Sequence, residues 1–174
     1  MDVIPAINAQ TFEEAKKQIE VAAEFSDWIH LDIIDGVFSP AQIWGNPDEI
    51  SKLKDQMSKI NVEVHLMVQS PEGVIDAWLR TGVVKRVIVH LEAMTDSVYI
   101  LEKCKKYGVE AMLAINPGTE VERLLAHKDD FSYFQVLAVA PGWAGQKFKP
   151  EMVAKVGFLR KMAPDVKIEV DGGI

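Results

Sequence analysis

The sequence predicts an α/β protein built as a (β/α)₈ barrel, and two observations point to this fold class. Seven short β-rich runs alternate with amphipathic segments along the 174 residues, without a linker or a low-complexity stretch. Such alternation is typical of a parallel sheet with helices packed outside it. Several runs also carry polar residues where they end, and the C-terminal ends of the strands build the active site of a barrel.

The expected strands are short runs of aliphatic and β-branched residues. They span residues 3–8, 28–34, 62–68, 87–92, 111–115, 135–139 and 168–170. The six helical segments between them begin at or next to residues 12, 47, 71, 96, 119 and 150. Caps support these bounds: Thr11 and Glu14 form a capping box before the first helix. Gly82 and Gly108 stand where the third and fourth helices need a C-terminal cap.

The length of the chain is short for this fold, since a barrel has eight strands and usually about 250 residues. A doubly wound open sheet is the rival fold, but no Gly-x-Gly-x-x-Gly turn follows the first strand. The chain also stops at a strand end, in the sequence DGGI, without a helix to cover that strand. We therefore expect one domain over residues 1–174, a barrel that lacks its last helix–strand–helix stretch.

Composition and charge exclude several classes of protein. Nineteen Lys and Arg against 26 Asp and Glu give a net charge of −7, which argues against nucleic acid or an anionic membrane as the partner. No apolar run approaches the roughly 18–20 residues that span a bilayer, and the N-terminus lacks the features of a signal peptide. The single cysteine, Cys104, excludes a disulfide framework and fits a reducing cytosol. We expect a cytoplasmic protein.

Two histidines and two aspartates lie near the ends of different expected strands. Side chains alternate along a strand, so His30 and Asp32 share one face, His65 lies on the next strand and Asp171 ends the last one. Imidazole and carboxylate ligands together suit Zn²⁺, Fe²⁺, Mn²⁺ or Co²⁺. A lone strand histidine is more often a hydrogen-bonded core residue. The spacing of His30 and Asp32, followed by a tight Asp-Gly turn, favours a metal site.

Four other residues have plainer interpretations. His90 and Glu92 end the fourth strand, and the sequence leaves open whether they support the metal ligands or only fill the core. His127 follows a helix among charged residues and is expected on the surface. Cys104 lies on an amphipathic helix and is expected to be a buried small apolar group.

Glycine-rich loops follow the sixth and seventh strands, at residues 141–146 and 171–173. Such loops expose backbone N–H groups that can hold a phosphate, although a Pro-Gly pair can also be turn chemistry alone. A Schiff-base aldolase would need a lysine at the C-terminal end of a strand, whereas Lys85 and Lys167 stand at strand starts. An orotidine-type decarboxylase would need a lysine where Ile34 stands.

Six blocks of the chain, in order and in register, resemble the ribulose-phosphate 3-epimerase family. They are HLDIIDGVFSP (30–40), VHLMV (64–68), HLEA (90–93), NPG (116–118), PGWAGQKF (141–148) and EVDGG (169–173). The resemblance implies a (β/α)₈ barrel that interconverts ribulose 5-phosphate and xylulose 5-phosphate in the pentose phosphate pathway, with one divalent metal ion.

The resemblance also implies roles for individual residues. The metal ligands would be His30, Asp32, His65 and Asp171. Asp32 and Asp171 would also accept and donate the proton. The residues expected to bind the sugar phosphate are His65, Met67, Gly142, Trp143, Ala144, Gly145, Gly172 and Gly173.

The sequence departs from the family in places that keep alternatives open. Ala6 stands where the family has a serine, Ile34 and Leu137 stand where it has methionines, and Ala144 replaces a glycine. The phosphate loop after an eighth strand is absent. The chain could therefore be an inactive fragment, a remnant that binds metal or sugar phosphate, or an epimerase of a longer ketose phosphate. The metal and the oligomeric state stay open, with a homo-oligomer among the options.

Overall fold

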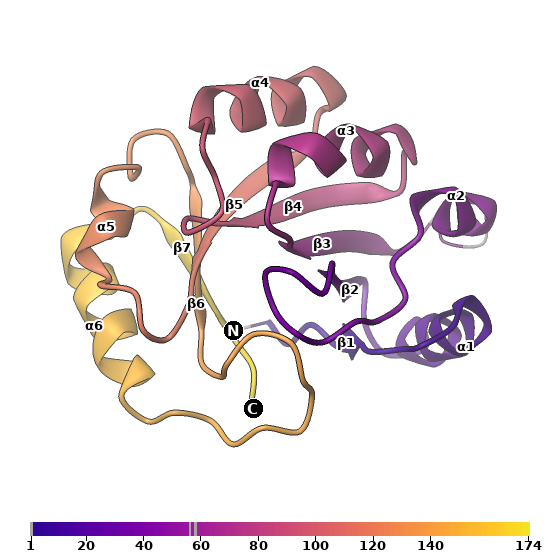
Figure 1. Cartoon of the computed structure of the whole chain (residues 1–174), viewed down its shortest axis with the longest axis horizontal. Helices are drawn as coiled ribbons and strands as arrows, with labels where there is room; N and C mark the ends of the chain where they lie inside the picture. The colour runs from indigo at the N-terminus through magenta and orange to yellow at the C-terminus, as the bar shows by residue number, and fades with distance from the viewer. Residues whose placement is uncertain (1, 56, 58) are drawn as a thin grey trace.

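The computed structural model describes residues 2–55, 57 and 59–174, which form seven strands with helices between them (Figure 1). The strands are β1 (Ala6–Ile7), β2 (Trp28–Ile34), β3 (Asn61–Met67), β4 (Val84–His90), β5 (Glu110–Ile115), β6 (Tyr133–Leu137) and β7 (Lys167–Asp171). The helices are α1 (Phe12–Ala22), α2 (Pro47–Ile50), the 3₁₀ turn η1 (Ser51–Leu53), α3 (Pro71–Arg80), α4 (Ser97–Tyr107), α5 (Glu122–Leu125) and α6 (Met152–Met162). Across the described ranges, no helix is long and apolar enough to cross a membrane.

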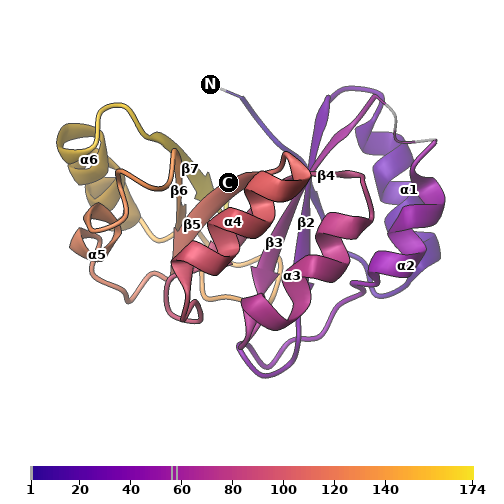
Figure 2. The same cartoon turned by 90° about the horizontal axis from the view of Figure 1, so that it is seen from above.

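The strands form one parallel sheet in the order β1-β2-β3-β4-β5-β6-β7. A doubly wound sheet reverses its strand order at a switch point, whereas this order is sequential throughout. Figures 1 and 2 show the sheet curling, with the helices around the outside of the curl. Among the described residues β7 does not pair with β1, so the sheet is an open, curled half-barrel. This confirms the predicted barrel class without the closing stretch.

Alternation along the strands divides the side chains between two environments. Outward residues such as Leu31, Val64 and Leu113 pack into the main core beneath the helices, where each is at most 1% exposed. The inward face is largely polar and carries most of the buried charged and polar side chains. The members of this inner group are His30, Glu63, His65, Arg86, His90 and Gln135. A functional site is therefore expected inside the curl.

Several element bounds differ from the sequence prediction. The first strand has two residues instead of six, and Pro5, which has no N–H, contributes only its carbonyl, which accepts from the N–H of His30. The fourth strand runs over residues 84–90 instead of 87–92, so Glu92 lies in the following turn. The second helix breaks into a 3₁₀ turn after Ile50, and part of its expected range, residue 56, lies outside the described residues.

Both predicted glycine caps are present. Gly108 ends α4 with φ +67° and its N–H donates to the carbonyls of Cys104 and Lys105. Gly82 follows α3 with φ +71°. Cys104 itself is buried, and burial raises the pKa of its thiol to about 12, which confirms it as an inert core residue.

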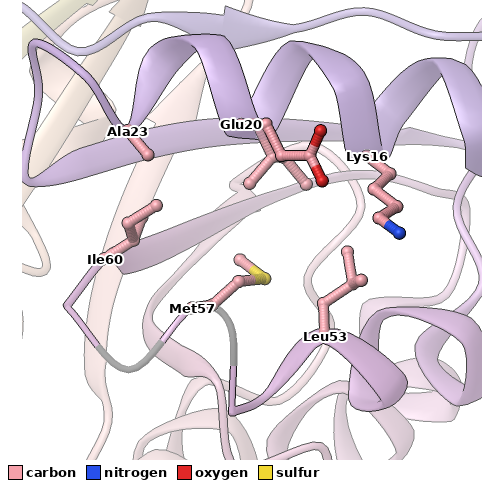
Figure 3. A pocket seen from close by; sticks show the side chains of 7 residues that line it. Lys16, Glu20, Ala23, Leu53, Met57 and Ile60 are labelled. Atoms are coloured by element: carbon pink, nitrogen blue, oxygen red, sulfur yellow. The ribbon is translucent and has the colours of Figure 1, made fainter.

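A small pocket of about 170 Å³ lies between α1 and the segment that leads into β3 (Figure 3). Leu53, Met57 and Ile60 line it from that segment, opposite Lys16 and Glu20 of α1. The pocket belongs to the outer layer of the fold, whereas the polar inner face of the sheet is lined by other residues.

Candidate active site

Three strands bring the four predicted ligands to one place inside the curl. In the sheet register Asp32 of β2 lies beside His65 of β3, two residue pairs beyond His30 and on the same face. Asp171 ends β7 on the far side of the open sheet. Curling of the sheet is what joins the two sides, because β2 and β7 are not neighbours in strand order.

The four side chains each point one ligand-type atom at a common centre, and these atoms all lie within 4.8 Å of one another. His30 Nε2 and His65 Nδ1 are 3.2 Å apart, and each is 3.1 Å from Asp32 Oδ1. Asp171 Oδ2 lies 3.5 Å from His65 Nδ1 and 3.9 Å from His30 Nε2.

This spacing fits a metal ion. Nitrogen and oxygen ligands bind Zn²⁺ at about 2.0–2.2 Å, so ligand atoms around one ion lie roughly 3–4 Å from one another. The observed separations of 3.1–3.9 Å match that range. Two imidazoles and two carboxylates also form a donor set that suits first-row divalent ions. That these residues bind a metal stays a prediction.

The site favours charged carboxylates beside charged imidazoles. Burial alone would lower the pKa of His30, but its hydrogen bonds to Asp32 and Glu63 outweigh burial and raise the pKa well above its ordinary value. Burial is likewise overcome at His65, whose pKa is raised by Asp171 and Asp32. Conversely, the histidines outweigh burial at Asp32 and Asp171 and lower the pKa of both carboxyls. Both aspartates are therefore anionic, as metal ligands and proton acceptors must be.

A charged network lies behind His30, at the N-terminal end of the strands. His30 Nδ1 is 2.8 Å from Glu63 Oε1, and Arg86 donates to Glu63 Oε2 at 2.8 Å. The Arg86 guanidinium lies between two aromatic rings, 4.5 Å from the centroid of Trp28 and 4.2 Å from that of Tyr133. Our sequence analysis did not predict this network. Alternation places Glu63 on the inner face, but only the register brings Arg86 to it.

His90 and Glu92 extend from the site on the other side. His90 is fully buried, and its Nε2 lies 2.8 Å from His65 Nε2. Glu92 lies 3.2 Å from His90 Nδ1 and accepts hydrogen bonds from Thr119 and the Asn116 N–H. Burial would raise the pKa of Glu92, but these contacts lower it to about 2. His90 therefore contacts the candidate ligand His65, and Glu92 contacts His90, so both residues do more than fill the core.

His127 lies elsewhere and takes no part in the site. It is half-buried and meets Phe131 edge-on at 6.0 Å between ring centroids. The expectation of a plain surface residue is therefore wrong in detail, because the ring packs against the core residue that follows α5.

The two predicted phosphate loops contact each other above the site. A Cβ on Gly173 would lie 3.1 Å from the carbonyl oxygen of Gln146 in the other loop, and 2.4 Å from the backbone nitrogen of Phe148 just after it. A Cβ on Gly142 would lie 2.2 Å from Ser39 Oγ, and this hydroxyl donates to the Pro141 carbonyl at 2.7 Å. Ser39, which the sequence analysis missed, thus holds the first loop from 102 residues away. Local sequence carries no signal for so distant a contact.

Ala144 does not need the backbone conformation that a glycine supplies. Positive φ angles within the described ranges occur only at glycines, including Gly142 and Gly145 on either side of it. Trp143 is 60% exposed. The Gly-to-Ala departure from the family pattern is therefore compatible with the shape of the loop.

We expect Gly173→Ala to destabilise the protein. The residue has φ +77° and its new methyl group would meet backbone atoms of Phe148, which cannot turn aside as a side chain can. Strain of this kind costs about 1–3 kcal/mol, or roughly 2–12 °C in melting temperature at this chain length. Thermal unfolding followed by circular dichroism measures it.

Gly157→Ala is the matched control. Gly157 lies inside α6, and a Cβ added to it would meet no atom within 4 Å. Alanine is the better helix former, so the melting temperature should stay or rise. Equal melting temperatures for both variants and the parent would show that the loops do not meet as described.

A groove of about 1220 Å³ follows the open side of the sheet and reaches the site. His30, Asp32 and Met67 line it, together with the loop at residues 140–146 and the C-terminal residues 164–174. Leu137 lines it as well. Three of the four candidate ligands, His30, Asp32 and Asp171, therefore line one continuous space with the glycine loops.

The singly wound parallel sheet and the convergent residues at its C-terminal ends define a (β/α)₈-type enzyme. The model of the ribulose-phosphate 3 epimerase family matches residues 2–174, and the chain belongs to this family. Membership places the chain among the epimerases, which are isomerases.

Individual relatives agree with this assignment. The chain is 38% identical over 167 residues to ribulose-phosphate 3-epimerase from Chlamydia pneumoniae, covering 92% of this chain and 70% of that protein. It is 32% identical to the Schizosaccharomyces pombe enzyme, covering 99% of this chain and 76% of that protein. Among solved structures, 3-hexulose-6-phosphate synthase from Salmonella typhimurium has a TM-score of 0.72 at 15% identity, covering 100% of this chain and 80% of the other. That likeness shows the fold alone.

Proposed function

We propose that this chain catalyses the 3-epimerisation of ribulose 5-phosphate to xylulose 5-phosphate with the help of one divalent metal ion. Family membership supports the reaction, and the observation that carries it for this chain is the convergence of two anionic aspartates. Asp32 and Asp171 come from β2 and β7, and each offers an oxygen to the same centre. The ligands of the ion would be these two carboxylates with His30 and His65.

The stereochemistry of the reaction explains why two carboxylates would be needed. Inverting a carbon next to a carbonyl requires removal of its proton and return of a proton to the opposite face of a planar enediolate, which one base cannot easily do. Asp32 would accept the proton, and Asp171, which is anionic in the metal-free site, would first take up a proton from solvent and then return it to the opposite face. Asp32 would release its proton to solvent after turnover. When bound, the ion would supply positive charge beside the two oxygens on which negative charge develops.

The glycine loops would hold the phosphate of the substrate. Residues 142–145 and 172–173 supply backbone N–H groups beside the groove that reaches the site. Met67 and Leu137 would form apolar walls of the sugar pocket. Ala6 offers no hydroxyl to the sugar and Ile34 stands where the family has a methionine, and these two departures support a longer ketose phosphate as an alternative substrate.

The name of one relative bears on the cellular setting of this chain. A rice relative, 34% identical, is named a cytoplasmic isoform, which supports a cytoplasmic location. The proposed reaction itself supports a place in the pentose phosphate pathway. The edges of β1 and β7 are unpaired in the described residues and invite association, which supports a homo-oligomer. Residues 1–174 are proposed to form one domain.

We expect the purified protein to contain about one divalent ion per chain and the His65→Ala variant to contain far less. His65 Nδ1 is 3.1–3.5 Å from both aspartates, so its loss removes a central ligand. Elemental analysis after exhaustive dialysis measures the metal. His127→Ala, a change at a histidine outside the site, is the control. Equal metal content in the parent and in His65→Ala would remove the proposed metal site.

A further inference from the structure

A row of three side chains runs from the candidate metal site to the loop that follows β5. His65 contacts His90 through their Nε2 atoms, 2.8 Å apart, and His90 Nδ1 lies 3.2 Å from Glu92 Oε2. Both histidines have 0% exposure, and their rings stack at 4.9 Å between centroids. Phe38 packs on the His90 ring at 4.8 Å. The two rings are therefore enclosed, and each ring nitrogen has a defined neighbour.

The two nitrogens of His65 face different partners. Nδ1 points toward Asp32 and Asp171, the other proposed ligands, and Nε2 points toward His90. A nitrogen that binds an ion must present its lone pair. In the neutral ring the proton must then be on Nε2.

The proton on His65 Nε2 fixes the tautomer of His90. A hydrogen bond between two ring nitrogens needs one donor and one acceptor, so His90 Nε2 must accept the proton of His65. The proton of His90 is then on Nδ1, opposite Glu92. An ionised carboxylate can only accept hydrogen bonds, so a hydrogen bond to Glu92 requires the proton of His90 to be on Nδ1.

Glu92 is itself held in place. Its Oε1 accepts from the backbone N–H of Asn116 at 2.8 Å and from the hydroxyl of Thr119. The backbone N–H can only donate, which keeps one carboxylate oxygen on that side and leaves the other, Oε2, for His90.

We propose that Glu92 is a positioning residue which, through His90, keeps the proton of His65 on Nε2 and leaves the Nδ1 lone pair free for the metal ion. The inference rests on the proposed metal-dependent function. Direct carboxylate partners of ligand histidines commonly change metal affinity by 10–100-fold, and Glu63 makes such a direct contact with His30. Here the carboxylate acts through a second imidazole.

The substitution Glu92→Gln should reverse the direction of the hydrogen bonds along this row of three side chains. The amide oxygen would remain with the Asn116 N–H, which puts the NH₂ group opposite His90 Nδ1. The amide then donates to Nδ1, so the proton of His90 moves to Nε2 and points at His65. His65 must accept it at Nε2 and carry its own proton on Nδ1, where the ion would bind.

Nitrogen NMR of the metal-free protein with ¹⁵N-labelled histidine, at a pH above the raised pKa of His65 so that its ring is neutral, reads this arrangement. The signals are few, since the chain has four histidines. The parent should show His90 protonated on Nδ1 and bare on Nε2, and Glu92→Gln should show the opposite tautomer. The affinity for Zn²⁺, measured by chelator competition, should fall by about 10–100-fold in Glu92→Gln. Glu72→Gln is the matched control, because Glu72 accepts from backbone N–H groups of Thr95 and Asp96 in the neighbouring loop. It should leave both readouts unchanged.

Three results would overturn the proposal. One is a parent His90 protonated on Nε2, a result that needs no variant to fold. Another is an unchanged His90 tautomer in folded Glu92→Gln. The third is an unchanged zinc affinity although His90 has changed to the opposite tautomer. A parent with the expected His90 tautomer that binds no zinc would contradict the proposed function while supporting the row of hydrogen bonds.

Discussion

In Asp32→Asn and in Asp171→Asn, exchange of the C3 proton of ribulose 5-phosphate with solvent is expected to fall by at least about 100-fold. A carboxamide is a poor base and a weak metal ligand, and positioned acid–base groups contribute about 10²–10⁴-fold to such reactions. Asp32 Oδ1 also contacts both histidines at 3.1 Å, so the substitution disturbs the ligand set as well. Deuterium incorporation at C3 from D₂O, followed by NMR, measures the exchange directly.

Asp129→Asn provides the control for this pair of substitutions. The Asp129 side chain is 85% exposed, and among the described residues it pairs only with Lys128, its chain neighbour. Its exchange rate should equal that of the parent. Near-parental exchange in either site variant would take that aspartate out of the acid–base pair.

The second large effect concerns stability: Arg86→Met is expected to lower the free energy of unfolding by about 3 kcal/mol. Glu63 has 0% exposure and accepts from Arg86 at 2.8 Å, so the substitution leaves a buried carboxylate without its cation. Removing one partner of a buried ion pair typically costs about 3–5 kcal/mol. We choose the lower end because His30 still contacts Glu63. Urea unfolding measures the difference.

Methionine keeps much of the apolar volume between Trp28 and Tyr133, so the loss of charge dominates the effect. The double variant Arg86→Met with Glu63→Gln should recover part of the lost stability, because no buried charge is then left unpaired. A double variant less stable than Arg86→Met alone would show that the ion pair is not the source of the effect. Lys128→Met, at an exposed pair, should change stability by less than about 1 kcal/mol.

The sequence predicted the inner face well because that face depends on local periodicity. Alternation alone put His30 and Asp32 on one side of β2, and the strand order brought His65 beside Asp32. The first strand was predicted too long because the prediction followed the apolar run and gave too little weight to Pro5, which has no N–H for the ladder. The fourth strand was displaced by three residues at its start, next to a register shift at Val62 and Glu63 that no local pattern encodes.

The contacts behind the ligands could not be predicted because they join distant parts of the chain. Glu63 and Arg86 are polar residues in strands that otherwise look apolar, which marks them as unusual, but their pairing depends on the register between β3 and β4. The role of His90 was left open for the same reason. Its ring stacks on that of His65 because the register of the neighbouring strands β3 and β4 places Ile88 beside His65, two residues before His90.

The central claim is that this chain is a metal-dependent epimerase of ribulose 5-phosphate. The most direct test incubates the purified protein with ribulose 5-phosphate and with Zn²⁺, Fe²⁺, Mn²⁺ or Co²⁺ in turn, and follows the appearance of xylulose 5-phosphate. We predict turnover with at least one ion, which a chelator abolishes and the same ion restores. A folded protein that shows no turnover and no C3 exchange with any of the four ions, or turnover that persists undiminished in chelator, would contradict the claim.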